Sequence, residues 1–218
     1  NAGIVSVSGN IKWDVGLNEQ SNVPLSQRNP IWVAASTHEQ EEQIVLDTHR
    51  ELLKHWPEAM LIWAPRHLER FELAFKQAKK VGFRIQKRSA QALPDANCQI
   101  FLLDSLGELL KFLPGAHAVF VGGSLQNIGG HNVLEPASLG LPVIVGPHTQ
   151  HFADIVNKLK QVDGLIQVQD TQQLQISLLS LLSNPKRAAA MGKNALHCVV
   201  QNNGALQKTK AQIDQRLW

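Results

Sequence analysis

The chain lacks several features that define whole classes of protein. Its 218 residues contain no run of about 18 apolar residues, so the sequence predicts no membrane-spanning helix. No secretory signal pattern is visible either. The two cysteines, Cys98 and Cys198, lie far apart in the sequence. One such pair is no disulfide framework, and this scarcity favours a reducing, cytosolic setting.

A strong charge of either sign is also missing. The formal net charge is +3, too small an excess to predict a nucleic-acid-binding protein. Six basic residues nevertheless gather within 76–88: Lys76, Lys79, Lys80, Arg84, Lys87 and Arg88. They fit a solvated helix face and the strand after it, or a patch that contacts anionic lipid head groups. The sequence leaves both interpretations open.

Apolar runs alternate with amphipathic runs from residue 31 onward. The predicted strands are 31–35, 60–64, 83–87, 99–103, 118–121, 142–145 and 165–168. The predicted helices are 39–55, 68–81, 106–113, 133–139, 151–160, 171–182, 185–202 and 205–217. This order is typical of an α/β fold, here a Rossmann-like parallel sheet with helices on both faces. The strands show little polar alternation, as a sheet covered on both sides requires.

The first thirty residues fit this alternation poorly. Residues 3–8 resemble a strand, and residues 18–29 are polar and rich in turn-forming residues. The chain also begins with Asn1 and not with Met. We therefore expect a piece of a longer protein, with 1–30 a connector from a missing N-terminal domain and 31–218 one domain.

Residues 122–136 (GGSLQNIGGHNVLEP) are the most informative segment, and they join a predicted strand to a predicted helix. Such a glycine-rich turn offers bare backbone N–H groups and a positive helix end to an anion. Glu135 follows Asn132 by three residues. Near a helix start it is expected to stay ionised and to accept hydrogen bonds from ribose hydroxyls. The segment predicts a pocket for a sugar–nucleotide donor; the alternative is a flexible turn before a helix.

Ligands of open α/β sheets bind at the carboxyl ends of the strands, so the other loops after strands are candidates too. Ser36 and Thr37 follow the strand 31–35, where their hydroxyls are expected to reach a phosphate or simply to cap the next helix. Arg66 follows the strand 60–64, where a guanidinium suits a phosphate. The alternative for Arg66 is a surface ion pair with Glu69 or Glu72.

The loop after the strand 99–103 contains Ser105 and Glu108 at the spacing of a capping box. One interpretation is a well-capped helix and nothing more. The functional interpretation is that backbone groups of Leu106 and Gly107 face the edge of a base, with Gly107 permitting close approach.

Metal and dinucleotide sites find little support. His148 and His151 have H-x-x-H spacing, but no Cys or Asp clusters with them at ligand spacing, so no metal and no cofactor are expected. No G-x-G-x-x-G follows the first strand, which argues against a Rossmann dehydrogenase.

Several segments resemble those of the Kdo transferases, which move 3-deoxy-D-manno-octulosonic acid (Kdo) from CMP-Kdo to lipid A precursor. They are 9–14 (GNIKWD), 35–39 (ASTHE), 65–67 (PRH), 122–124 (GGS), 129–136 (GGHNVLEP) and 146–148 (GPH). The resemblance implies a GT-B fold, of which residues 31–218 are the C-terminal, CMP-Kdo-binding half. It also implies that the acceptor groove, the membrane anchor and the catalytic carboxylate base lie in the missing N-terminal half, so no catalytic residue is expected here.

The resemblance also implies which residues contact CMP. These are Pro65, Arg66, Leu106, Gly107, Glu108, Asn132, Val133, Leu134 and Glu135. Ser36, Thr37 and Ser124 are expected as further phosphate contacts. The implied setting is the cytoplasmic face of the bacterial inner membrane, with lipid A precursor as acceptor and an anionic membrane surface as a further partner.

The implied reaction is an inverting, metal-independent glycosyl transfer, in which CMP leaves once its phosphate charge is neutralised. Two alternatives remain open. One is a GT-B enzyme that uses a UDP-sugar, although a diphosphate would require more cations than this loop displays. The other is a non-catalytic nucleotide-binding domain.

Overall fold

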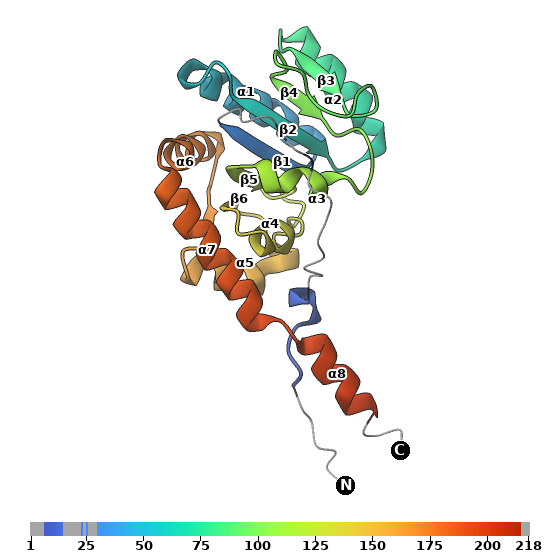
Figure 1. The fold of residues 1–218 in the computed structure, drawn as a ribbon, viewed down its shortest axis with the longest axis vertical. Helices are drawn as coiled ribbons and strands as arrows, with labels where there is room; N and C mark the ends of the chain where they lie inside the picture. Colours follow the sequence, from blue (N-terminus) through green and yellow to red (C-terminus); the bar gives the residue numbers. More distant parts are fainter. Residues whose placement is uncertain (1–6, 15–22, 24, 26–29, 215–218) are drawn as a thin grey trace.

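A seven-stranded parallel sheet forms the centre of the computed structural model, which describes residues 7–14, 23, 25 and 30–214. The strand order is β3-β4-β2-β1-β5-β6-β7 (Figure 1). The strands are β1 (Ile31–Thr37), β2 (Met60–Pro65), β3 (Ile85–Lys87), β4 (Ile100–Leu102), β5 (Ala118–Val121), β6 (Val143–Val145) and β7 (Leu165–Gln167). The chain builds outward from β1 to β2 and then returns to place β5 on the other side of β1. A topological switch point therefore lies between β1 and β5.

Helices cover both faces of the sheet, as the apolar strands predict. The longer helices are α1 (Glu39–His55), α2 (Leu68–Lys80), α5 (Ala153–Gln161), α6 (Thr171–Ser183), α7 (Pro185–Asn202) and α8 (Ala205–Asp214). Two short helices, α3 (Leu109–Phe112) and α4 (Leu134–Ser138), lie in connections at the carboxyl edge. The buried side chains of α1, α2 and α6 join one core cluster, and those of α3, α4 and α5 join the other.

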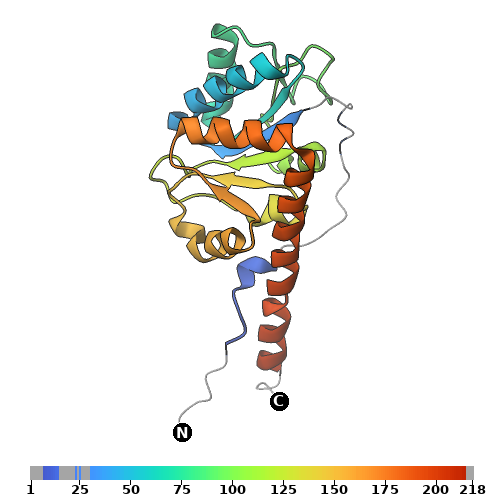
Figure 2. The same cartoon turned by 90° about the vertical axis from the view of Figure 1, so that its left-hand side faces the viewer.

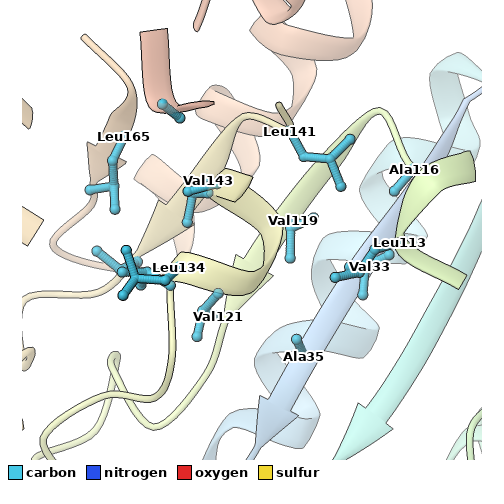
Figure 3. Packing of buried hydrophobic residues seen from close by; sticks show 14 of the residues in the cluster. Val33, Ala35, Leu113, Ala116, Val119, Val121, Leu134, Leu141, Val143 and Leu165 are labelled. Carbon is cyan, nitrogen blue, oxygen red and sulfur yellow. The ribbon is translucent and has the colours of Figure 1, made fainter. Parts of the chain in front are cut away.

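Successive side chains of one strand point into these two different clusters. Val33 and Ala35 of β1 pack on the α4 side, together with Val119, Val143 and Leu134 (Figure 3). Trp32 and Ala34 pack in the opposite cluster. All residues of β1 except Ser36 are buried, which explains why the strand reads as a continuous apolar run.

The elements predicted from residue 31 onward are all found, with three corrections at their starts. The strand expected at 83–87 begins only at Ile85. The helix expected at 106–113 begins only at Leu109, because Gly107 has φ +76°, a left-handed conformation that no α-helix contains. The helix expected from 151 begins at Ala153, after a 3₁₀ turn η3 (Gln150–Phe152). The helix predicted at 205–217 is seen from Ala205 to Asp214, and its last predicted residues lie outside the described ones.

Residues 7–14 pack along α8 (Figure 2). Trp13, in the 3₁₀ turn η1 (Ile11–Trp13), is buried. Asp14 accepts hydrogen bonds from the backbone N–H groups of Gly204 and Leu206, which satisfies donors at the start of α8. Of the strand expected at 3–8, residues 3–6 lie outside the described residues, and residues 7 and 8 are described but form no strand. The interpretation of 1–30 as a connector stays a prediction.

Some of the basic residues within 76–88 form ion pairs with acidic side chains. Lys87 and Lys76 both pair with Glu72, and Arg88 pairs with Glu108. These contacts favour the interpretation as a solvated helix face and strand. Within the described residues, no helix combines the length and the apolar character needed to cross a bilayer.

Candidate functional site

A pocket of about 380 Å³ opens at the carboxyl edge of the sheet, where β1, β2, β4 and β5 end around the switch point. Seven of the residues singled out from the sequence line it: Ser36, Pro65, Arg66, Leu106, Gly107, Asn132 and Glu135. They come from four separate loops, as the rule for ligands of open α/β sheets predicts. The apolar floor includes Ala35, Ala64, Leu103 and Val121 at the strand ends.

Arg66 supplies a positive charge to this pocket. Its side chain is exposed, and no ion pair or side-chain hydrogen bond joins it to another described residue. The two carboxylates proposed as alternative partners are engaged elsewhere: Glu69 lies 4.0 Å from His67, and Glu72 pairs with Lys87. Its backbone N–H donates to Thr37 O at 2.9 Å, which fixes the loop against β1. The guanidinium is therefore available to an anion.

Asn132 and Glu135 form a second polar wall. The Asn132 amide donates to Glu135 Oε1 at 3.0 Å, and its own oxygen accepts the Leu134 N–H at 3.0 Å. Glu135 Oε2 has no protein partner among the described residues. Burial raises the pKa of Glu135, an effect that Asn132 and Arg66 oppose. Glu135 does lie in the first turn of α4, as expected, but burial there acts against the charged form, and an ionised Glu135 stays a prediction.

The glycine-rich loop differs most from its sequence-based interpretation, because three N–H groups in its first part are already bonded to a side chain of the protein. The carboxylate of Glu41, a fully buried side chain of α1, accepts the backbone N–H groups of Gly123 at 2.7 Å, Ser124 at 3.1 Å and Leu125 at 3.0 Å. It also accepts the His38 N–H at 3.1 Å. The anion bound by these N–H groups is therefore the Glu41 carboxylate, a side chain of the protein itself.

Gly122 shows why the loop needs its glycines. A Cβ atom there would lie 2.7 Å from Glu41 Oε2 and 2.7 Å from Thr37 Cα. Any side chain would push the loop away from α1 and β1. Gly122 therefore serves close approach to an internal carboxylate, and no external ligand is needed to explain this glycine.

Two predicted phosphate contacts are contradicted by burial. The Thr37 side chain is fully buried, and its hydroxyl accepts the Trp63 indole N–H at 2.8 Å. Ser124 is also fully buried: its hydroxyl donates to Val121 O at 2.6 Å and accepts the Gly146 N–H at 2.8 Å. Neither hydroxyl reaches the pocket. Ser36 does line it, with an unusual left-handed φ of 53° at the irregular end of β1.

Three of the predicted CMP contacts do not line the pocket. Glu108 bonds Ser105 and Arg88, and these partners lower its pKa against the opposing effect of burial. The side chains of Val133 and Leu134 belong to the hydrophobic core. Leu106 and Gly107 do line the pocket. Leu106 is 65% exposed, so its apolar side chain is accessible to a ligand. The base-contact prediction therefore rests on these two.

Sequence reasoning missed a contact between two histidines beside the pocket. His38 Nε2 and His131 Nε2 lie 2.8 Å apart, and the His67 ring meets the His38 ring edge-on at 5.0 Å between centroids. In the described part of the chain, no group of three or more His, Cys, Asp or Glu side chains is placed to hold a metal ion. The segments that meet are far apart in sequence, so no local pattern signals the contact.

The chain is similar to known proteins over most of its length. The family model for glycosyl transferases group 1 matches residues 70–197. The chain is 38% identical, over 94% of its length, to the 3-deoxy-D-manno-octulosonic acid transferase of Haemophilus influenzae. It is 31% identical, over 99% of its length, to that of Bordetella pertussis. It covers 50% and 53% of these two proteins, so it spans about half of the curated relatives it matches.

Solved structures agree with this likeness. The crystal structure of the C-terminal CMP-Kdo binding domain of WaaA from Acinetobacter baumannii matches with a TM-score of 0.76 and 34% identity. The match covers 80% of this chain and 91% of that one. The C-terminal domain of a glycosyl transferase group 1 protein (LpcC) from Francisella tularensis matches with a TM-score of 0.52 and 15% identity, over 81% and 87% of the two chains. This second likeness shows the fold alone.

Proposed function

The chain belongs to the glycosyl transferases group 1 family and, within it, to the Kdo transferases, and we propose that it binds the CMP-Kdo donor. The fold is that of a GT-B C-terminal domain. We propose that the whole protein transfers Kdo from CMP-Kdo to lipid A precursor in lipopolysaccharide biosynthesis. The observation that carries the proposal is the pocket at the switch point, where Arg66 and Glu135 both stand without a full set of protein partners.

The lining residues suit the parts of CMP. The Arg66 guanidinium offers a charge-assisted hydrogen bond to the phosphate, which solvent around this exposed side chain limits to about 0.5–1 kcal/mol. Glu135 accepts ribose hydroxyls through its open oxygen while Asn132 holds the other. Leu106 supplies an apolar surface for the base, and Gly107 lets the backbone come close to its edge. After the cost of ordering the ligand, these contacts predict a CMP dissociation constant of roughly 10 μM to 1 mM.

The proposed reaction is an inverting transfer. CMP leaves as its phosphate charge is neutralised, and here that charge meets Arg66. A base in the other half of the protein takes the proton of the acceptor hydroxyl. We propose that this transfer is metal-independent and that this chain alone binds nucleotide without turning it over. The proposed place of action is the cytoplasmic face of the inner membrane, reached through the N-terminal part.

Isothermal titration calorimetry of the chain with CMP and with UDP tests the proposal. We expect CMP to bind more tightly, because one guanidinium neutralises a monophosphate better than a diphosphate. Tighter binding of UDP would overturn the choice of donor. Failure to transfer Kdo when the chain is joined to the N-terminal half of a Kdo transferase would favour a non-catalytic nucleotide-binding domain.

A further inference from the structure

Two imidazoles join distant loops beside the pocket. His38 immediately precedes α1, and His131 follows Gly129 and Gly130. Their Nε2 atoms lie 2.8 Å apart, and their ring planes are within 2° of parallel. Gly123 makes room for His131, because a Cβ atom there would lie 2.8 Å from the His131 ring. His131 and Arg66 line the same pocket.

The charges around this pair are mostly positive or neutral. Arg66 and His67 face it from the β2–α2 loop, and His151 faces His131 from η3. Glu41 is the carboxylate that acts on His38, yet its oxygens already accept four backbone N–H groups. Among the described residues, no carboxylate forms a hydrogen bond with either imidazole.

These surroundings disfavour the charged form of both rings. Burial, aided by His38 and Arg66, lowers the pKa of His131 to about 4. Burial also lowers the pKa of His38, against the opposing effect of Glu41. Each neutral ring carries one N–H proton, and one of these protons lies between the two Nε2 atoms.

The pair has room for one more proton. A proton from solvent added to Nδ1 of the ring that donates through Nε2 gives an imidazolium that keeps its hydrogen bond to the second ring. A second added proton would leave both Nε2 atoms as donors and break the contact. The geometry therefore sets an upper limit of one proton for an intact pair.

We propose that the His38–His131 pair binds the phosphate of the nucleotide and takes up one proton from solvent as it does so. The inference rests on the proposed nucleotide function and deepens it. Burial disfavours the charged form of both rings, and the negative charge of a phosphate beside Arg66 and His131 opposes that effect, so a bound phosphate stabilises the imidazolium form. The protonated pair then adds a charge-assisted hydrogen bond to the anion.

Calorimetric titration of CMP at pH 7.5, in buffers with different ionisation enthalpies, measures this proton. At that pH the phosphate of free CMP is already mostly a dianion, so an uptake reports on the protein. We expect an uptake of up to about one proton per CMP, and none for cytidine, which has no phosphate. CMP binding without uptake would overturn this inference and leave the proposed function standing. Absence of CMP binding would overturn both.

Matched variants locate the proton. His131→Asn and His38→Asn are expected to abolish the uptake and to weaken CMP binding by roughly tenfold, through loss of one charge-assisted bond. His55→Asn is the control, because His55 is exposed at the far end of α1. Glu135→Gln tests the other titratable group of the pocket. Loss of the uptake in Glu135→Gln with retention in the histidine variants would place the proton on Glu135 and overturn the inference.

A measurement on the unaltered chain removes dependence on variant folding. Histidine Cε1–H resonances, followed by NMR from pH 5 to 8, report the protonation of each ring with and without CMP. The inference requires the pKa of one ring of the pair to rise when CMP is bound. Two rings that stay neutral in the complex would refute it.

Discussion

Glu41 and Glu135 are two carboxylates at the same edge of one sheet, and they have opposite surroundings. Glu41 is fully buried and accepts four backbone N–H groups between 2.7 and 3.1 Å. Glu135 lines the pocket and accepts one side-chain amide, and burial raises its pKa. The first carboxylate has all the partners it needs within the protein. The second has an oxygen left for a ligand.

The difference shows how a glycine-rich loop with a structural role can be told apart from one that binds a ligand. An anion-binding loop is recognised by the bare N–H groups it presents, and here an internal carboxylate accepts three of them, at Gly123, Ser124 and Leu125. Polar groups left unsatisfied at a pocket are the better sign of a ligand, since a buried polar group without a partner costs about 1–3 kcal/mol. Four predictions test the contrast, in order of decreasing effect.

Glu41→Ala should destabilise the fold strongly. It leaves a set of N–H groups in the interior without an acceptor, and the loss is expected to be about 3–5 kcal/mol in the free energy of unfolding. Urea denaturation followed by circular dichroism measures it. Glu39→Ala, in the same helical turn but 72% exposed at its side chain, is the control and should cost less than about 1 kcal/mol. Equal losses in the two variants would contradict the structural role of Glu41.

His49 extends the contrast to a histidine with every partner inside the protein. Its Nδ1 accepts the Trp32 indole N–H at 3.2 Å, and its Nε2 lies 2.9 Å from Gln99 O. Burial lowers its pKa to about 3, so below about pH 6.5 the unfolded chain binds a proton that the folded chain refuses. Stability should therefore fall as the pH falls through this window, by about 2–3 kcal/mol at pH 4.5.

Denaturation midpoints measured from pH 7.5 to 4.5 test this acid sensitivity. His49→Gln has no imidazole to titrate, so its stability should fall less steeply over the same range. Parallel pH profiles for the two proteins would show that other groups cause the acid sensitivity.

Glu135→Ala should have the opposite signature to Glu41→Ala. We expect CMP binding to weaken at least tenfold, or about 1.4 kcal/mol, because the ribose hydroxyls lose their acceptor. Thermal stability should change little, since burial already disfavours the charged carboxylate. Glu69→Ala is the control, because Glu69 is 75% exposed at its side chain and does not line the pocket. Unaltered CMP affinity by calorimetry would remove Glu135 from the ribose.

Arg66→Ala should weaken CMP binding severalfold, with a loss that shrinks as salt is added, because the guanidinium is exposed and its field is screened. Arg70→Ala offers a comparison: Arg70 bonds Glu42 at 2.6 Å and Glu39 at 2.8 Å, so it should affect stability and not binding. A loss in Arg66→Ala that is independent of salt would point to packing.

Much of the fold was accessible from the sequence. The strand 118–121 and the helices 39–55 and 185–202 have the predicted bounds, because apolar periodicity and end signals are local. The start of α3 was not accessible, because the backbone at Gly107 is set by its surroundings. The location of the pocket follows from the rule that ligands bind where parallel strands end. Applying this rule requires only the order of the strands along the chain.

The sequence alone determined the parallel α/β sheet, its carboxyl edge and the loops that meet there, since these follow from patterns within about twenty residues. Only the tertiary structure decided which polar groups at that edge are already satisfied. Glu41 meets the glycine-rich loop across more than 80 residues, and His38 meets His131 across 93. Such pairings depend on how distant segments pack, and no local pattern encodes them.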